Sequence, residues 1–337
     1  MSAFTPGYSN DEAQLLMQLS SLAYVDETPL HGESIAQQEA RMKGDINAAL
    51  SAGPPYLNGW RVAWGPALSP DRGNMLYVAG NAALNQYAVA VRGTDWSFIL
   101  DWIEDFASVL PLVPYPALNA GKIAAGTLVG LQTLQNLNFM AFVASLPADA
   151  GVYVTGHSLG GCLASVIAPL VFNQLGAGRV KVYTFAAPSP GDAGYQSYFT
   201  GLFGSDSMAY RVHDTLDAVP DAWTTLTTIE AYYQGFYDCP QDLKDIINFG
   251  IREVGSEYAT VGNDQPLTGH IIWPFGEDRG RDEIDPIGDA LFLWQVAQQH
   301  SHINYLSLLG AEATTPELAR VKGIVSRIRR RAAAAGA

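Results

Sequence analysis

A serine set between glycines, with an apolar segment on each side, restricts the fold of this chain more than any other feature. Residues 156–160 read Gly-His-Ser-Leu-Gly and directly follow the apolar segment Val152 to Thr155. A strand that turns sharply into a helix holds the residue at the turn in a strained conformation, and small neighbours prevent the collisions that such a turn would cause. The sequence therefore predicts a buried strand, a tight turn that presents Ser158, and a helix that continues to Leu175.

Strands and helices alternate on both sides of this turn. Hydrophobic spacing predicts early helices over 11–24 and 34–50, and late helices over 287–299 and 302–309. Further strands are predicted over 60–64, 75–79, 87–91, 180–185 and 210–213. This alternation is typical of a mostly parallel central sheet with helices on both faces. Together with the turn at Ser158, it predicts an α/β-hydrolase fold that spans 1–337 as a single domain. We interpret residues 222–286 as an insertion before the last histidines, and 320–337 as a basic, alanine-rich tail.

Composition excludes several classes of partner. The 337 residues contain 19 Lys and Arg against 33 Asp and Glu, and the resulting net charge of −14 argues against nucleic acid. Apolar stretches stay well below the ~20 residues of a membrane span, so no transmembrane segment is expected. The N-terminus lacks the pattern of a signal peptide, which favours a cytoplasmic location, with secretion as the alternative. No cofactor and no metal are expected, because the acidic residues over 278–289 fit no standard Ca²⁺ loop.

A nucleophilic serine requires a base and an orienting acid, and in α/β-hydrolases both follow the serine in the chain. Asp214 and Asp217 both come directly after the strand over 210–213, and the Ala-Val-Pro turn that follows Asp217 favours Asp217 as the acid. His300 and His302 open the last apolar segment, and chain order does not choose between them. The N–H of Leu159, at the start of the helix, points to where an oxyanion would form.

Five motifs in this order resemble the class 3 lipases, a family related to fungal triacylglycerol lipases. They lie at residues 90–94, 154–161, 183–188, 210–220 and 301–305, and the resemblance extends from about residue 10 to about residue 310. It implies that Thr94 joins Leu159 in the oxyanion hole, and it selects His302 over His300 as the base of a Ser158, Asp217, His302 triad. The chain departs from the family in the long stretch 222–286.

The resemblance also implies a lid. Large apolar residues alternate with acids directly after Thr94, as in a short amphipathic helix. We assign about 95–110 to the lid, and we assign Trp96, Phe98, Trp102 and His157 to substrate binding and the lid. The alternative is a fixed helix that completes the core.

These features predict a serine ester hydrolase, most simply a lipase that cleaves acylglycerols at a lipid–water interface. A phospholipase A1 or a feruloyl-type esterase is the alternative within the same chemistry, because the pocket rather than the triad sets the preference. A catalytically silent lipid-binding protein is the alternative from another class, and it would be expected to lack a member of the triad.

Overall fold

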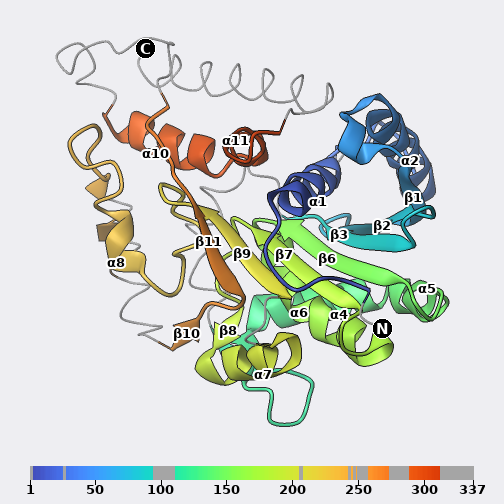
Figure 1. Cartoon of the computed structure of the whole chain (residues 1–337). Helices are drawn as coiled ribbons and strands as arrows, with labels where there is room; N and C mark the ends of the chain where they lie inside the picture. Colours follow the sequence, from blue (N-terminus) through green and yellow to red (C-terminus); the bar gives the residue numbers. More distant parts are fainter. Residues whose placement is uncertain are drawn as a thin grey trace.

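A central sheet of seven strands organises the computed structural model of the chain (Figure 1). The structure describes residues 3–25, 28–93, 111–204, 208–241, 244–245, 248, 257–272 and 288–311. The strand order is β1-β2-β3-β6-β7-β9-β11, and the strands from β3 to β11 run parallel, whereas β1 and β2 are antiparallel additions. The predicted α/β-hydrolase fold is confirmed.

Six of the seven strands in this sheet and five of the described helices lie where the sequence predicted them. The strands are β1 (Trp60–Leu68), β2 (Met75–Asn81), β3 (Gln86–Val91), β6 (Gly151–His157), β7 (Val180–Phe185), β9 (Ala209–Asp214) and β11 (Asn263–Leu267). The helices are α1 (Asn10–Leu22), α2 (Ile35–Ala52), α4 (Ala125–Gln135), α5 (Phe139–Ala144), α6 (Leu159–Leu175), α7 (Ala193–Phe203), α8 (Leu226–Ile229), α10 (Gly288–Gln299) and α11 (His302–Leu308), with a 3₁₀ turn η1 (Pro55–Leu57). A small second sheet has the order β10-β8-β5-β4, from β10 (Tyr258–Ala259), β8 (Gly191–Asp192), β5 (Lys122–Ala124) and β4 (Leu112–Pro114).

The edge strand β11 lies inside the stretch that the sequence indicated to be an insertion. It pairs parallel with β9 and so belongs to the central sheet. Its sequence, Asn-Asp-Gln-Pro-Leu, lacks the apolar pattern of a buried strand because an edge strand is largely exposed and tolerates proline.

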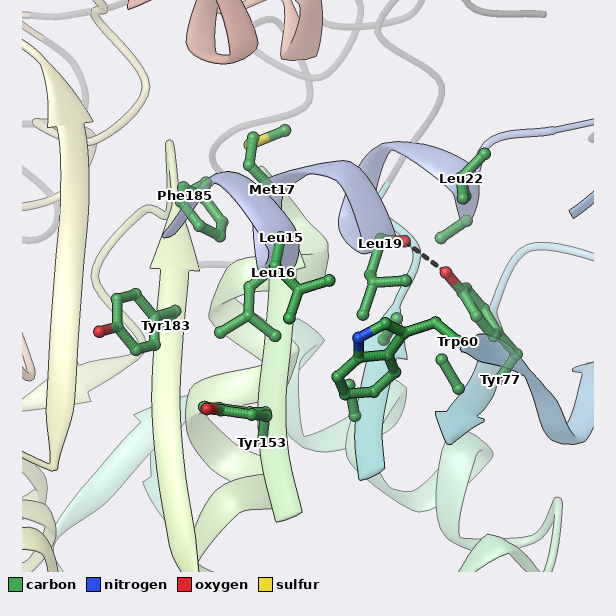
Figure 2. Close-up of a cluster of buried hydrophobic side chains, with 14 of the residues drawn as sticks. Leu15, Leu16, Met17, Leu19, Leu22, Trp60, Tyr77, Tyr153, Tyr183 and Phe185 are labelled. Carbon is green, nitrogen blue, oxygen red and sulfur yellow. Dashed lines mark hydrogen bonds between the residues drawn. The ribbon is translucent and has the colours of Figure 1, made fainter. Parts of the chain in front are cut away.

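Helix α1 covers one face of the sheet. Leu15, Leu16 and Leu19 point from α1 toward the strands, where Trp60 and Tyr77 meet them (Figure 2). The Tyr77 hydroxyl donates a hydrogen bond to the Leu19 carbonyl at 2.7 Å. Each leucine that is removed from water in this way contributes roughly 1.5–3 kcal/mol to stability. Helix α1 is thus fixed on the sheet, and its C-terminal end lies over the strands that carry the site.

A partly buried ionic cluster holds the other end of α1. The Lys181 side chain on β7 is only 2% exposed, and its ammonium lies 2.6 Å from a carboxylate oxygen of Glu12. Tyr183 and Tyr153 donate hydrogen bonds to the same carboxylate at 2.6 and 2.9 Å. Since breaking a buried pair leaves a charge without compensation, this cluster holds α1 in one position.

The opposite face of the sheet is covered by α4, α5, α6 and α7, with α6 against β6 and β7 (Figure 1). Valines that alternate with the tyrosines along these strands, such as Val152 and Val154, point into this second core. Helix α6 therefore starts at the carboxyl edge of a fully buried strand. None of the helices that the structure describes is both long and apolar enough to span a bilayer.

Candidate active site

The turn between β6 and α6 places Ser158 at the carboxyl edge of the sheet. Ser158 adopts φ 61° and ψ −135°, a strained conformation for a residue with a side chain. Its N–H donates to the Phe185 carbonyl at 2.9 Å. A Cβ at Gly156 would overlap the Gly160 carbonyl, and a Cβ at Gly160 would overlap the Val91 carbonyl. The glycines are therefore needed for the close approach of three backbone segments, as the sequence motif indicated.

His300 and Asp217 complete a hydrogen-bonded chain that starts at Ser158. His300 Nε2 lies 2.7 Å from Ser158 Oγ, and His300 Nδ1 lies 2.8 Å from Asp217 Oδ2. His300 and Asp217 are almost fully buried, whereas Ser158 retains 8% exposure. A hydroxyl, an imidazole and a carboxylate in this order form the arrangement that activates a serine.

The resemblance placed the base at His302, but the histidine that the structure brings to Ser158 is His300. Helix α10 ends at Gln299, and Ser301 caps the next helix by accepting a hydrogen bond from the Ile303 N–H at 3.2 Å. His302 is therefore the first residue of α11, and its ring stacks on Tyr24 with centroids 5.5 Å apart. His300 lies in the non-helical link between the two helices, and there its ring reaches Ser158.

Asp217 is held by three groups. One carboxylate oxygen accepts the Val219 N–H at 3.0 Å, within the turn that the sequence indicated. The other accepts the hydroxyl of Tyr305 at 2.8 Å in addition to His300 Nδ1. Burial, with help from the nearby carboxylates, raises the pKa of Tyr305 well above its ordinary value, so this hydroxyl remains a donor. Sequence reasoning did not identify Tyr305, because only the fold brings it to Asp217.

His157 was assigned to substrate binding and the lid, but the structure buries this residue. Its ring is 2% exposed and contacts protein atoms at both nitrogens. Nε2 lies 2.8 Å from the His300 carbonyl, and because a carbonyl only accepts, Nε2 carries the proton. Burial lowers the pKa of His157 well below its ordinary value, and the neighbouring His300 and His302 lower it further. His157 is thus a neutral donor that holds the backbone of His300.

Tyr24 at the end of α1 joins these segments. Its hydroxyl accepts the Gly93 N–H at 3.2 Å and lies 3.1 Å from the His157 carbonyl and 3.3 Å from His157 Nδ1. One hydroxyl therefore touches the end of the Val91 strand and the elbow, although 133 residues separate Tyr24 from His157. No sequence motif singled out this residue.

The oxyanion side of the site is described only in part. Leu159 is the first residue of α6, so no carbonyl within the helix can accept its N–H. Thr94, Trp96, Phe98, Trp102 and the whole predicted lid over 95–110 lie outside the described residues. Among the described residues, no group of three or more His, Cys, Asp or Glu is placed to hold a metal ion.

The fold and this hydrogen-bonded chain define an α/β-hydrolase with a Ser-His-Asp site. Residues 88–226 match the family model described as lipase (class 3). The lipase ZK262.3 of Caenorhabditis elegans is 28% identical over 216 residues, which are 63% of this chain and 55% of that protein. The chain therefore spans about half the length of this curated relative. These matches confirm the resemblance to the class 3 lipases that the motifs indicated.

Solved structures agree with this family. The crystal structure of M37 lipase has 27% sequence identity and a TM-score of 0.71, with 90% of this chain and 93% of that chain covered. The triacylglyceride lipase of Rhizomucor miehei, at 18% identity and a TM-score of 0.53, covers 79% of this chain and 83% of its own and shows the fold alone. Family and fold together support a lipase or another ester hydrolase.

Proposed function

We propose that this protein hydrolyses carboxylic esters by way of an acyl-enzyme. The observation that carries the proposal is the unbroken chain from Ser158 Oγ through His300 to Asp217, with distances of 2.7 and 2.8 Å. A catalytically silent lipid-binding protein would have no need to keep all three groups in this buried and strained arrangement.

In the proposed reaction, Ser158 Oγ attacks the ester carbonyl while His300 Nε2 takes its proton. Asp217 stabilises the imidazolium that forms, and the Leu159 N–H stabilises the oxyanion. His300 then gives the proton to the departing alkoxide, which leaves as the alcohol. Water attacks the acyl-enzyme, His300 takes a proton from the water, and the return of that proton to Ser158 releases the acid.

We further propose that the substrates are acylglycerols at a lipid–water interface. The names of the relatives support this proposal, since each of the three comparison proteins is called a lipase or a triacylglyceride lipase. A phospholipase A1 or a feruloyl-type esterase would use the same Ser158 chemistry with another pocket. A panel of p-nitrophenyl esters from short to long chains, an emulsified triacylglycerol, a phospholipid and a feruloyl ester distinguishes these substrates.

The nucleophile is tested by Ser158→Ala. We expect kcat to fall by about 10⁴- to 10⁶-fold, because removing one member of such a unit loses most of its effect. A serine-directed phosphonate should label the wild-type chain and leave Ser158→Ala unlabelled. Ser165→Ala is the matched control, since Ser165 is a buried serine on the helix that follows Ser158 and its hydroxyl donates to the Cys162 carbonyl. Equal labelling of wild type and Ser158→Ala would exclude Ser158 as the nucleophile.

A further inference from the structure

A second carboxyl, Asp214, is buried beside Asp217 and has no part in the proposed reaction. It is the last residue of β9 and is 1% exposed. One oxygen accepts the Leu216 N–H at 3.0 Å, and the other accepts the side-chain amide of Asn304 at 2.8 Å. A Cβ at Gly269 would overlap the first of these oxygens, so the neighbouring chain is shaped to admit the carboxyl.

Asn304 continues this contact to the segment that carries His300. Its amide also lies 3.1 Å from the carbonyl of Gln299, the residue directly before His300. Gln299 in turn donates to the His270 carbonyl at 2.9 Å, which ties α10 to the chain that follows β11. The Asp214 N–H donates at 2.9 Å to the hydroxyl of Tyr305, the same hydroxyl that donates to Asp217. Asp214 therefore contacts the supports of both the acid and the base.

We propose that Asp214 is a positioning residue which, through Asn304, holds the link carrying His300 in register with Asp217, and which does so more tightly when it is ionised. This inference rests on the proposed function. Hydrogen bonds to a charged acceptor are roughly twice as strong as those to a neutral one. Since a misplacement of about 1 Å in a catalytic group lowers rates by up to 10²-fold, a firmer hold on this link raises kcat.

Ionisation of Asp214 falls near neutral pH. Its pKa is raised to about 7, chiefly by burial and also by the nearby Asp217, while the Leu216 N–H and Asn304 oppose the shift. The titratable groups that act on it are Asp217 in the turn after β9, Tyr233 in the segment after α8 and Tyr305 on α11. His213 precedes Asp214 on β9. His270, which is exposed, follows β11, and Asp264 lies on it.

Asp214→Asn tests whether the charge of Asp214 matters. Asn is close in shape to the protonated acid but cannot ionise, so a merely structural role would be kept and positioning by the charge would be lost. We expect the ratio of wild-type to variant kcat to be near 1 at pH 6 and roughly five- to tenfold at pH 8.5, with KM unchanged. A ratio that stays constant between pH 6 and pH 8.5 would overturn the proposal.

Two further variants complete the kinetic test. Asn304→Ala keeps both carboxyls and removes the bridge, so its loss of kcat should also be larger at pH 8.5 than at pH 6. If Asp214→Asn does not fold, Asn304→Ala tests the proposal in its place. A kcat of Asn304→Ala equal to that of wild type at pH 8.5 would contradict the proposal. Asp264→Asn is the matched control, because Asp264 lies on the adjoining strand, has a side chain 58% exposed and pairs with Arg211. The ratio of wild-type kcat to Asp264→Asn kcat should be the same at pH 6 and at pH 8.5.

Thermal unfolding tests the ionisation of Asp214 without any substrate. A carboxyl whose pKa is higher in the folded than in the unfolded chain stabilises the fold at low pH, and this stability is lost as pH rises from about 4 to about 7. The Tm of Asp214→Asn relative to wild type should therefore be higher at pH 8.5 than at pH 5. A Tm difference that does not change with pH would contradict the proposal, whereas a wild type inactive on every ester would contradict the proposed function alone.

Discussion

Ser158 and His300 meet at 2.7 Å, yet the two regions that hold them are built differently. The elbow around Ser158 is held by backbone contacts among neighbouring glycines and the strand that ends at Val91. The link around His300 is held by side chains from other elements, namely His157 on β6 and Asn304 on α11. The nucleophile is thus held by close backbone contacts that glycines permit, whereas the base is held by side chains from other elements.

The largest effect is expected from changing the base itself. His300→Ala should lower kcat by about 10⁴- to 10⁶-fold, because Ser158 loses its proton acceptor. His302→Ala should leave kcat within about tenfold of wild type, because this ring stacks on Tyr24, whereas the ring bonded to Ser158 is that of His300. Hydrolysis of a short p-nitrophenyl ester measures both.

His302→Ala serves as the control for His300→Ala. The histidines are two residues apart and both are buried, so a general loss of folding would affect both enzymes. Circular dichroism melts separate that outcome from a loss of chemistry. If His302→Ala were the inactive variant and His300→Ala the active one, the arrangement of the α10–α11 link described above would be wrong.

A smaller effect is expected from a methyl group added to the elbow. Gly160→Ala would place a Cβ against the Val91 carbonyl and the Gly93 N–H. Since both are backbone atoms, the strand or the helix must shift, which should cost about 1–3 kcal/mol of stability and lower kcat up to about 10²-fold. Chemical denaturation and ester hydrolysis measure these two quantities.

Gly44→Ala is the matched control for this substitution. Gly44 lies inside α2 and has no atom near its added Cβ, so alanine should stabilise the helix by roughly 0.5–1 kcal/mol and leave kcat unchanged. An elbow that accepted Gly160→Ala with unchanged stability and rate would show that the close approach of the three segments is not required.

The difference between the two regions also explains what the sequence could predict. The strand, the turn at Ser158, the helix after it and the turn that orients Asp217 are local patterns, and the structure contains each of them. Whether His300 or His302 faces Ser158 depends on where α10 ends and where Ser301 caps the next helix, and the motif at 301–305 does not fix that. The sequence indicated Asp214 as a carboxyl directly after a strand. Its hydrogen bond to Asn304 could not be predicted, because the two residues are 90 positions apart.

Other features that the sequence did not predict also depend on the tertiary structure. Strand β11 is polar because it lies at an edge of the sheet, so its sequence gives no strand signal. The bonds of Tyr24 to His157 and of Glu12 to Lys181 join residues 133 and 169 positions apart. Such contacts satisfy buried polar groups that would otherwise destabilise the fold, but no local spacing encodes them.

The smallest effect is expected where the two regions are joined. Tyr24→Phe removes a single hydroxyl that accepts the Gly93 N–H and lies beside His157, which in turn holds the His300 carbonyl. We expect kcat to fall about three- to tenfold and stability to fall by about 1 kcal/mol. Tyr77→Phe is the control, because it removes an equally buried hydroxyl that donates to the Leu19 carbonyl under the same helix. Its stability should fall by a similar amount with kcat unchanged. Equal kcat values for the two variants would mean that the elbow and the His300 link keep their relative position without Tyr24, and that the sheet alone aligns them.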